Sequence, residues 1–235
     1  MKKFIALTLI NMLMTTFWRP PSAGAEQISV DSISVRGNLF GAAAGVDYQN
    51  RNFISGDMEY DLNYWGLILR PSVRLTDRWT VFLRLGYSRL VFDRPEFGAT
   101  DYDEWGFEYG GGVNFLLFRW KILKAFLEGE CSYLATERRV SEGTERGNLL
   151  QWRAGGEAGA DISVVYPYVG FEYNDARLTH EYSTPERDFS HHYEPRDRWK
   201  TFAGVRVAIP PFTAIQGRYY FGKDMLMDVS LGLSF

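Results

Sequence analysis

The residues best suited to chemistry are three histidines in or beside one long polar stretch, residues 180–198. His180, His191 and His192 lie there among serines and acidic residues. Imidazole titrates near neutral pH, so a histidine beside a serine or a carboxylate could act as the general base of a hydrolase. The neighbouring candidates are Ser183, Ser190, Glu181, Glu186, Asp188 and Glu194.

Two observations count against catalysis and against a metal site. No nucleophile motif accompanies the histidines in a strand context, and long polar loops collect such residues without chemistry. His191 and His192 are adjacent, and adjacent residues on a strand point to opposite faces and rarely bind one ion. We expect no enzyme activity and no cofactor, and we keep a rim-located hydrolase (a protease or a lipid-modifying enzyme) as a third hypothesis.

Charged residues form the second group of candidate functional residues. They lie in the middle of apolar segments. By parity, eight cationic and eight anionic side chains share one face. We expect an interior charge network that includes Arg70, Arg84, Glu108, Glu128, Glu130, Arg153, Glu157, Glu172, Arg206, Arg218 and Asp228. A lumen lined by charges of one sign would make a selective pore. Equal numbers of cationic and anionic side chains favour a salt-bridged plug, because an unpaired buried ion is costly. We predict the plug; a small channel for ions or small solutes is the alternative.

Ten segments with apolar residues at every second position must position these side chains. Period two indicates strands. The segments cover residues 39–49, 64–75, 79–91, 104–117, 123–135, 150–162, 168–174, 199–209, 213–221 and 224–235. Most of their connections alternate between short turns and longer polar stretches, the latter at 50–61, 93–103, 136–148 and 180–198. Short turns at one end and long loops at the other are typical of an outer-membrane barrel.

The kinds of residues on the apolar face indicate whether this face meets lipid or the core of a soluble protein. Tryptophans lie near segment ends and aliphatic residues near the middle, as lipid interfaces require. The expected aromatic girdle consists of Trp65, Trp79, Trp105, Trp120, Trp152 and Trp199. A soluble sandwich with its charges in water fits any one strand but fits the set less well. In hydrocarbon no strand edge can stay unpaired, so the sheet must close, and ten is an even number as bacterial barrels require.

The start of the chain has the features of a secretory signal peptide. A basic "MKK" precedes the apolar run "FIALTLINMLMTTFW", and Ala23 and Ala25 form a cleavage pattern. The run is too short for a membrane helix, the alternative. We predict a cleaved segment at 1–25, a short periplasmic leader at 26–37 and a barrel at 38–235. Cleavage removes three of the 26 basic residues and leaves 23 against 29 acidic ones, a formal charge of −6, which does not favour nucleic acid as a partner.

The chain ends "VSLGLSF". With the signal peptide and the alternating strands, this ending resembles the small outer-membrane β-barrel proteins of Gram-negative bacteria. The resemblance identifies a class and no subfamily. It implies that Phe235, Leu233, Leu231 and Val229 form the signal read by the barrel-assembly machinery.

Together these features predict an all-β protein, a closed antiparallel transmembrane β-barrel of ten strands, with eight as the alternative, in the bacterial outer membrane. We expect a surface or structural role in which the long loops bind a ligand or mediate adhesion, or only shield the barrel. The expected partners are outer-membrane lipid and lipopolysaccharide, the assembly machinery and an unknown extracellular ligand. Arg89 has outward parity and should lie at the interface near lipid phosphate, unless a bulge turns it inward.

Overall fold

The computed structural model describes residues 39–56, 58–92, 101–140, 143–185, 188–209, 213–221 and 225–234. The predicted signal segment at 1–25, the leader at 26–37 and Phe235 lie outside these residues. Among the described residues, no helix is long and apolar enough to cross a membrane. The structure there is built from eleven strands: β1 (Phe40–Ser55), β2 (Met58–Arg74), β3 (Trp79–Phe92), β4 (Tyr102–Trp120), β5 (Leu123–Val140), β6 (Gly143–Ala160), β7 (Val165–Ser183), β8 (Asp188–Pro195), β9 (Trp199–Ile209), β10 (Thr213–Phe221) and β11 (Met225–Ser234).

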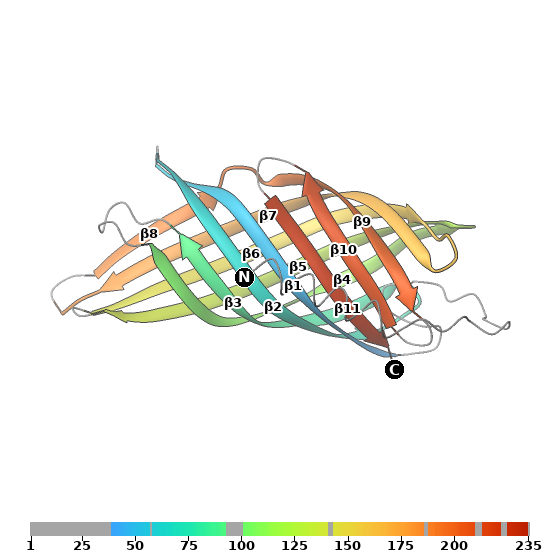
Figure 1. Cartoon of the computed structure of the whole chain (residues 1–235), viewed down its shortest axis with the longest axis horizontal. Coiled ribbons are helices and arrows are strands. Elements are labelled where there is room, and N and C mark those ends of the chain that lie inside the picture. Colours follow the sequence, from blue (N-terminus) through green and yellow to red (C-terminus); the bar gives the residue numbers. More distant parts are fainter. Residues whose placement is uncertain are drawn as a thin grey trace, which may run out of the picture.

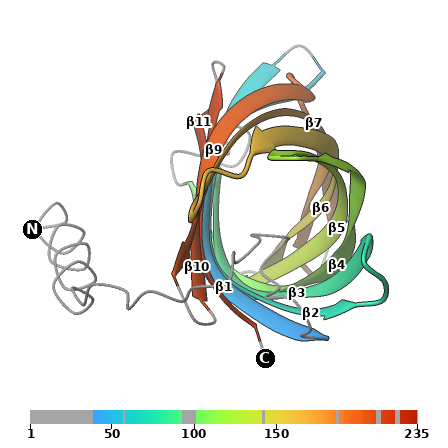
Figure 2. The same ribbon diagram turned by 90° about the vertical axis from the view of Figure 1, so that its right-hand side faces the viewer.

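Ten of the strands form a closed antiparallel ring, which confirms the predicted fold class (Figures 1 and 2). The ring runs from β1 through β7, continues with β9, β10 and β11, and closes where β11 pairs with β1. That last pairing joins residues 41–50 to residues 225–234. The first and last described strands therefore form the closing pair, and the described ring has no unpaired edge to meet lipid.

β8 is an additional strand that the sequence analysis did not predict. It pairs with β7 over residues 178–183 and with β1 at Phe53 and Ile54. In Figure 1 it lies at the end of the molecule opposite to the C-terminus. At that end the ring runs through β8 instead of β9, β10 and β11, so it narrows from ten strands to eight.

Three of the stretches predicted as polar loops are largely strand. β1 and β2 continue to Ser55 and Met58, and β5 and β6 pair as far as Val140 and Gly143. From Trp152 to Gly143 the sheet rises about 20 Å along the barrel axis, at about 3.3 Å per residue and a tilt of about 40°. We call this strand-built extension beyond the upper tryptophans the crown. The prediction of loops was wrong there because crown strands face water outside and carry polar residues on that face.

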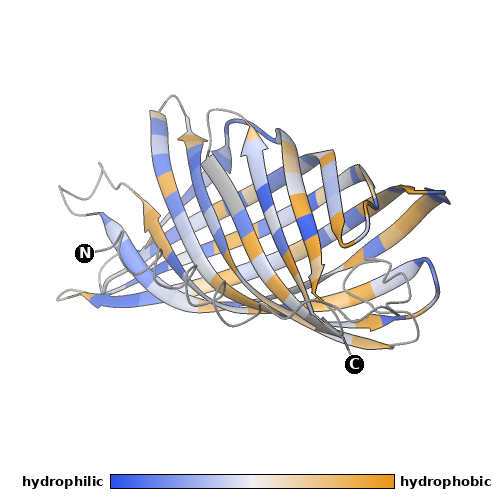
Figure 3. Ribbon diagram, turned by 45° about the vertical axis from the view of Figure 1, so that its right-hand side comes forward, coloured by the Kyte–Doolittle hydropathy of each residue, from blue (hydrophilic) through white to orange (hydrophobic). Residues whose placement is uncertain are grey.

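The two faces of each strand follow the predicted parity. Hydrophobic and hydrophilic residues alternate along the strands (Figure 3), and the outward set includes Leu83, Leu85 and Phe107, all exposed. The short connections, at 75–78, 121–122 and 161–164, lie at one end, which is the periplasmic end in such barrels.

The upper interior is filled by a buried apolar cluster, which we call the apolar seal. It consists of Phe53, Tyr60, Leu62, Tyr64, Leu90, Phe92, Tyr102, Leu134, Leu149, Ala176, Leu178 and Tyr193. A second aromatic cluster lies toward the periplasmic end and includes Phe126, Tyr166, Tyr168, Phe202 and Tyr220. Charged side chains occupy the level between the two clusters.

Candidate functional site

Arg84 is the centre of the buried charges. Its guanidinium donates to Glu108 at 2.5 Å, to Asp47 at 2.8 Å and to Glu130 at 3.0 Å, and none of its side chain is exposed. These partners come from β1, β4 and β5, whereas Arg84 is on β3. Residues of matching parity meet in the lumen because each strand turns every second side chain inward.

Arg218 on β10 organises a second group. Its Nη2 lies 3.2 Å from both Glu128 and Glu157, and its Nη1 lies 3.8 Å from Glu172. Arg206 also contacts Glu157, at 3.3 Å. The Arg218 guanidinium lies 4.4 Å from the ring centroid of Phe202, so an aromatic face covers the side that carboxylates leave open.

All eleven residues proposed for the interior network make ion pairs inside the barrel. The ion pair of Asp228 does not follow the strand register. Its cross-strand neighbour is Arg218, but its ion pair is with Arg70 at 4.0 Å. Arg218 instead turns toward the carboxylates on β5, β6 and β7, which surround it more fully than one aspartate would.

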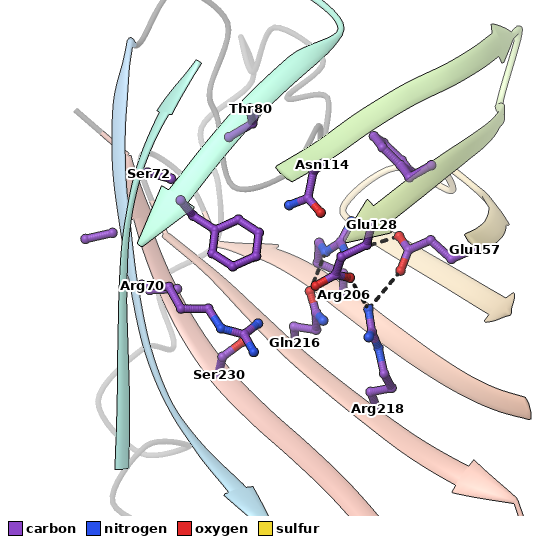
Figure 4. Close-up of a pocket in the computed structure, with 14 residues that line it drawn as sticks. Arg70, Ser72, Thr80, Asn114, Glu128, Glu157, Arg206, Gln216, Arg218 and Ser230 are labelled. Atoms are coloured by element: carbon purple, nitrogen blue, oxygen red, sulfur yellow. Dashed lines mark hydrogen bonds and ion pairs between the residues drawn. The ribbon is translucent and has the colours of Figure 1, made fainter. Parts of the chain in front are cut away.

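A cavity of about 90 Å³ lies below this network, near the periplasmic ends of the strands. Figure 4 shows Arg70 and Ser230 on one side of it and Glu128, Arg206, Gln216 and Arg218 on the other. Phe82 and Phe126 add apolar surface. Several members of the network border this cavity, so it is a place where a small ligand could meet them.

Two inward glycines accommodate aromatic rings of the neighbouring strand. A Cβ at Gly204 would lie 2.3 Å from the Tyr168 ring, and one at Gly170 would lie 2.4 Å from the Phe202 ring. Real Cβ atoms do not approach so closely. Only glycine therefore lets these rings lie flat on the neighbouring strand, and the flat rings fill the lower lumen.

Two of the three histidines share a face of the sheet, and the third lies on the opposite face. His180 is buried and packs edge-on against Phe92 and Tyr102, with ring centroids 5.2 and 5.5 Å away. His191 stands opposite His180 on β8. His192 points the other way, where its Nδ1 lies 3.1 Å from the Thr179 hydroxyl.

The structure supports neither a serine nucleophile beside His180 nor a metal site in the described residues. Ser183 donates to Asp188 at 2.5 Å, away from the buried imidazole of His180. Within the described ranges, no group of three or more His, Cys, Asp or Glu side chains is placed to hold a metal ion.

All six tryptophans proposed for the girdle are exposed on the outside of the barrel. Trp65 and Trp105 meet edge-on at 6.4 Å, and Trp105 stacks on Tyr87 at 5.2 Å. Trp105 is paired with Arg89 on β3. From Trp79 to Arg89 the strand climbs about 25 Å at about 3.3 Å per residue and a tilt of about 40°, which is the usual height of a lipid-facing band.

The structure also shows the orientation of other residues that were predicted to point outward. Arg89 points outward and donates to Asp103 at 2.6 Å, so no bulge turns it inward. Val229 and Leu231 are exposed on β11, whereas the side chains of Leu233 and Phe235 lie outside the part of the chain that the structure describes.

The aromatic residues of the predicted loops divide into two sets. Phe53, Tyr102 and Tyr193 are buried in the apolar seal, so they cannot contact a ligand at the surface. Phe189 remains exposed on β8. Parity does not account for this difference, because Phe189 and Tyr193 are four residues apart on β8 and therefore share one face of the strand.

No family model matches the sequence, and no curated protein matches it. Similar solved structures include the β domain of the Bordetella autotransporter BrkA, with 13% identity, 84% of this chain and 100% of that chain covered, and a TM-score of 0.51. The translocator domain of the autotransporter NalP from Neisseria meningitidis has 11% identity over 88% of this chain and 92% of that chain, with a TM-score of 0.49. The outer-membrane protease OmpT from Escherichia coli has 8% identity over 88% of this chain and 100% of that chain, with a TM-score of 0.46.

The chain has the fold of a bacterial outer-membrane β-barrel. Together with its exposed apolar exterior and tryptophan girdle, this fold locates the protein in the bacterial outer membrane. At such low identity the likeness shows the fold and no activity.

Proposed function

We propose that this barrel is a non-conducting, non-enzymatic surface protein whose crown binds an extracellular ligand. The observation that supports a closed lumen is the apolar seal above a layer of paired charges. An ion that crossed the barrel would have to leave water, pass buried Phe and Tyr rings, and then displace Arg84 from its carboxylates. Each of these steps opposes conduction.

The crown is the part that supports a binding role. Its outer face carries exposed ion pairs such as Arg146 with Glu137, at 3.0 Å, and Arg196 with Glu59. Glu59, Glu137 and Arg146 are held on paired strands, so they form a rigid surface. A rigid polar surface above the membrane loses little conformational entropy when it binds a partner. The proposed contacts within the membrane are lipid and lipopolysaccharide along the girdle.

The surroundings of the histidines support a role without hydrolysis. A general base must lie within hydrogen-bond reach of its nucleophile, but His180 is packed among aromatic rings and His192 lies on the opposite face.

Planar-bilayer recording tests the closed lumen. The purified wild-type chain should give no stable single-channel current, whereas a variant with Leu90→Ala and Phe92→Ala in the apolar seal should give openings. The matched control carries Leu85→Ala, an outward position on the same strand, and should remain silent. A stable conductance of the wild-type barrel would refute the plug and favour a channel.

Adhesion of bacteria that display the chain tests the crown. Cells with the wild-type protein, cells with Glu137→Ala and Arg146→Ala together, and cells without the protein are compared on a panel of immobilised glycans and proteins. We expect retention that the crown variant reduces. Equal retention of wild-type and protein-free cells across the panel would contradict the binding role.

A further inference from the structure

The cavity at the periplasmic end has two charged side chains that differ from the rest of the interior network. The other network side chains that make the ion pairs described above are at most 9% exposed. Arg70 is 21% exposed and Glu128 is 26% exposed. Both line the cavity, so among the eleven named network residues the two with clear access to water are one cation and one anion that border the same space.

Two of the three arginines that line this space keep donor capacity. Arg70 contacts Glu130 at 3.1 Å through Nη2, and its Nε has no hydrogen-bond partner among the described residues. The Nε of Arg218 likewise has none, although its side chain is only 6% exposed and its two terminal nitrogens are engaged. A buried donor without an acceptor is costly, so an acceptor from a ligand or from water would stabilise it.

The remaining lining defines the size and character of a ligand. About 90 Å³ is room for several water molecules or one small organic molecule. Ser72, Ser230 and Asn114 supply further polar groups, and Phe82 and Phe126 supply apolar surface. In Figure 4 the Arg70 guanidinium lies across the cavity from Glu128.

We propose that this cavity binds a small zwitterion from the periplasmic side, with its carboxylate at Arg70 and its ammonium group at Glu128. A simple anion would pair with Arg70 and lie in the field of Glu128 and Glu157, and a simple cation would meet Arg70, Arg206 and Arg218. A molecule with both charges satisfies both walls at once. This site lies at the opposite end of the lumen from the crown, so it is independent of the proposed surface role.

Equilibrium dialysis of the folded, purified barrel in detergent tests the site, with radiolabelled glycine, β-alanine and γ-aminobutyrate as zwitterionic probes and acetate and methylammonium as single-charge probes. We expect saturable binding of at least one zwitterion at one molecule per barrel. Acetate and methylammonium should bind about tenfold more weakly or worse, because each loses one charge-assisted contact.

Two variants and two matched controls identify the residues. Arg70→Gln and Glu128→Gln should each weaken zwitterion binding by about tenfold or more. Arg138→Gln and Glu104→Gln change an ion pair of similar exposure, 23% and 28%, at the crown end of the lumen, and should leave binding unchanged. Heat-modifiable gel migration confirms that each variant is folded.

Three results would overturn the proposal. The first is that the folded wild-type barrel binds none of the zwitterions saturably. Acetate or methylammonium could bind as tightly as the best zwitterion, which would replace the proposed ligand class. Binding could also survive both cavity substitutions, which would place it elsewhere on the barrel.

Discussion

Replacing Arg84 by methionine is the sharpest test of how the interior is stabilised. Methionine keeps most of the volume of the side chain and removes three contacts to carboxylates. Asp47 and Glu130 would each retain Arg153, at 3.8 Å and at hydrogen-bond distance respectively. Among the described residues Glu108 has no second cationic partner, and it would keep only its hydrogen bonds from Tyr64 and Ser88. Arg84→Met therefore leaves one uncompensated buried carboxylate.

The expected loss in the free energy of unfolding follows from that one unpaired carboxylate. Removal of one partner of a buried ion pair destabilises proteins by about 3–5 kcal/mol, so the folding equilibrium should fall by roughly a hundredfold to several thousandfold. In the double variant Arg84→Met with Glu108→Gln, the unpaired carboxylate is replaced by a neutral amide. We expect this double variant to recover about half or more of the loss, since a neutral amide is far cheaper to bury.

Denaturant unfolding in detergent micelles measures these differences by linear extrapolation, with tryptophan fluorescence as the signal. Arg146→Met breaks an exposed ion pair with Glu137 and serves as the control, with an expected loss of about 0.2–1 kcal/mol. If Arg84→Met cost less than about 1 kcal/mol, or if Glu108→Gln made it worse, the described network would not stabilise the barrel as argued.

Three further predictions concern the walls of the barrel. Gly204→Ala should lower the unfolding midpoint because its Cβ would lie 2.3 Å from an aromatic ring, whereas Gly217→Ala, with no atom within 4 Å, should not; equal midpoints would refute the packing argument. Leu83→Arg, on the lipid face, should destabilise by about 2–4 kcal/mol, and Asn148→Arg on the crown exterior should be close to neutral; the comparison is made by the same unfolding assay. Phe235→Asp should reduce the amount of assembled barrel in outer-membrane fractions, and unchanged amounts would contradict the proposed assembly signal.

Parity along the chain was sufficient to predict which way most side chains point. Leu83 and Phe107 face outward while Arg84 and Glu108 face inward because successive residues of a strand point to opposite faces. The exposed tryptophan girdle follows from the same rule. The ten-stranded ring could also be predicted, since it needs only the number of alternating segments that span lipid and the requirement that no edge remain unpaired.

The crown could not be predicted from the same signal. The segments at 50–61, 136–148 and 180–198 are polar because their outer face meets water, so they resemble loops in the sequence even where they form strands. β8 is an example: its residues alternate weakly, and only its pairing with β7 and β1 makes it part of the wall.

The sequence by itself determined the solvent of each face, the closure of the sheet and the composition of the interior. Only the tertiary structure decided the partners within that interior. Asp228 contacts Arg70 on β2 and not its cross-strand neighbour Arg218, and Arg218 contacts carboxylates from three other strands. The physical reason is that parity fixes the face of a residue, whereas long inward side chains cross the lumen and meet residues from strands that are distant in sequence.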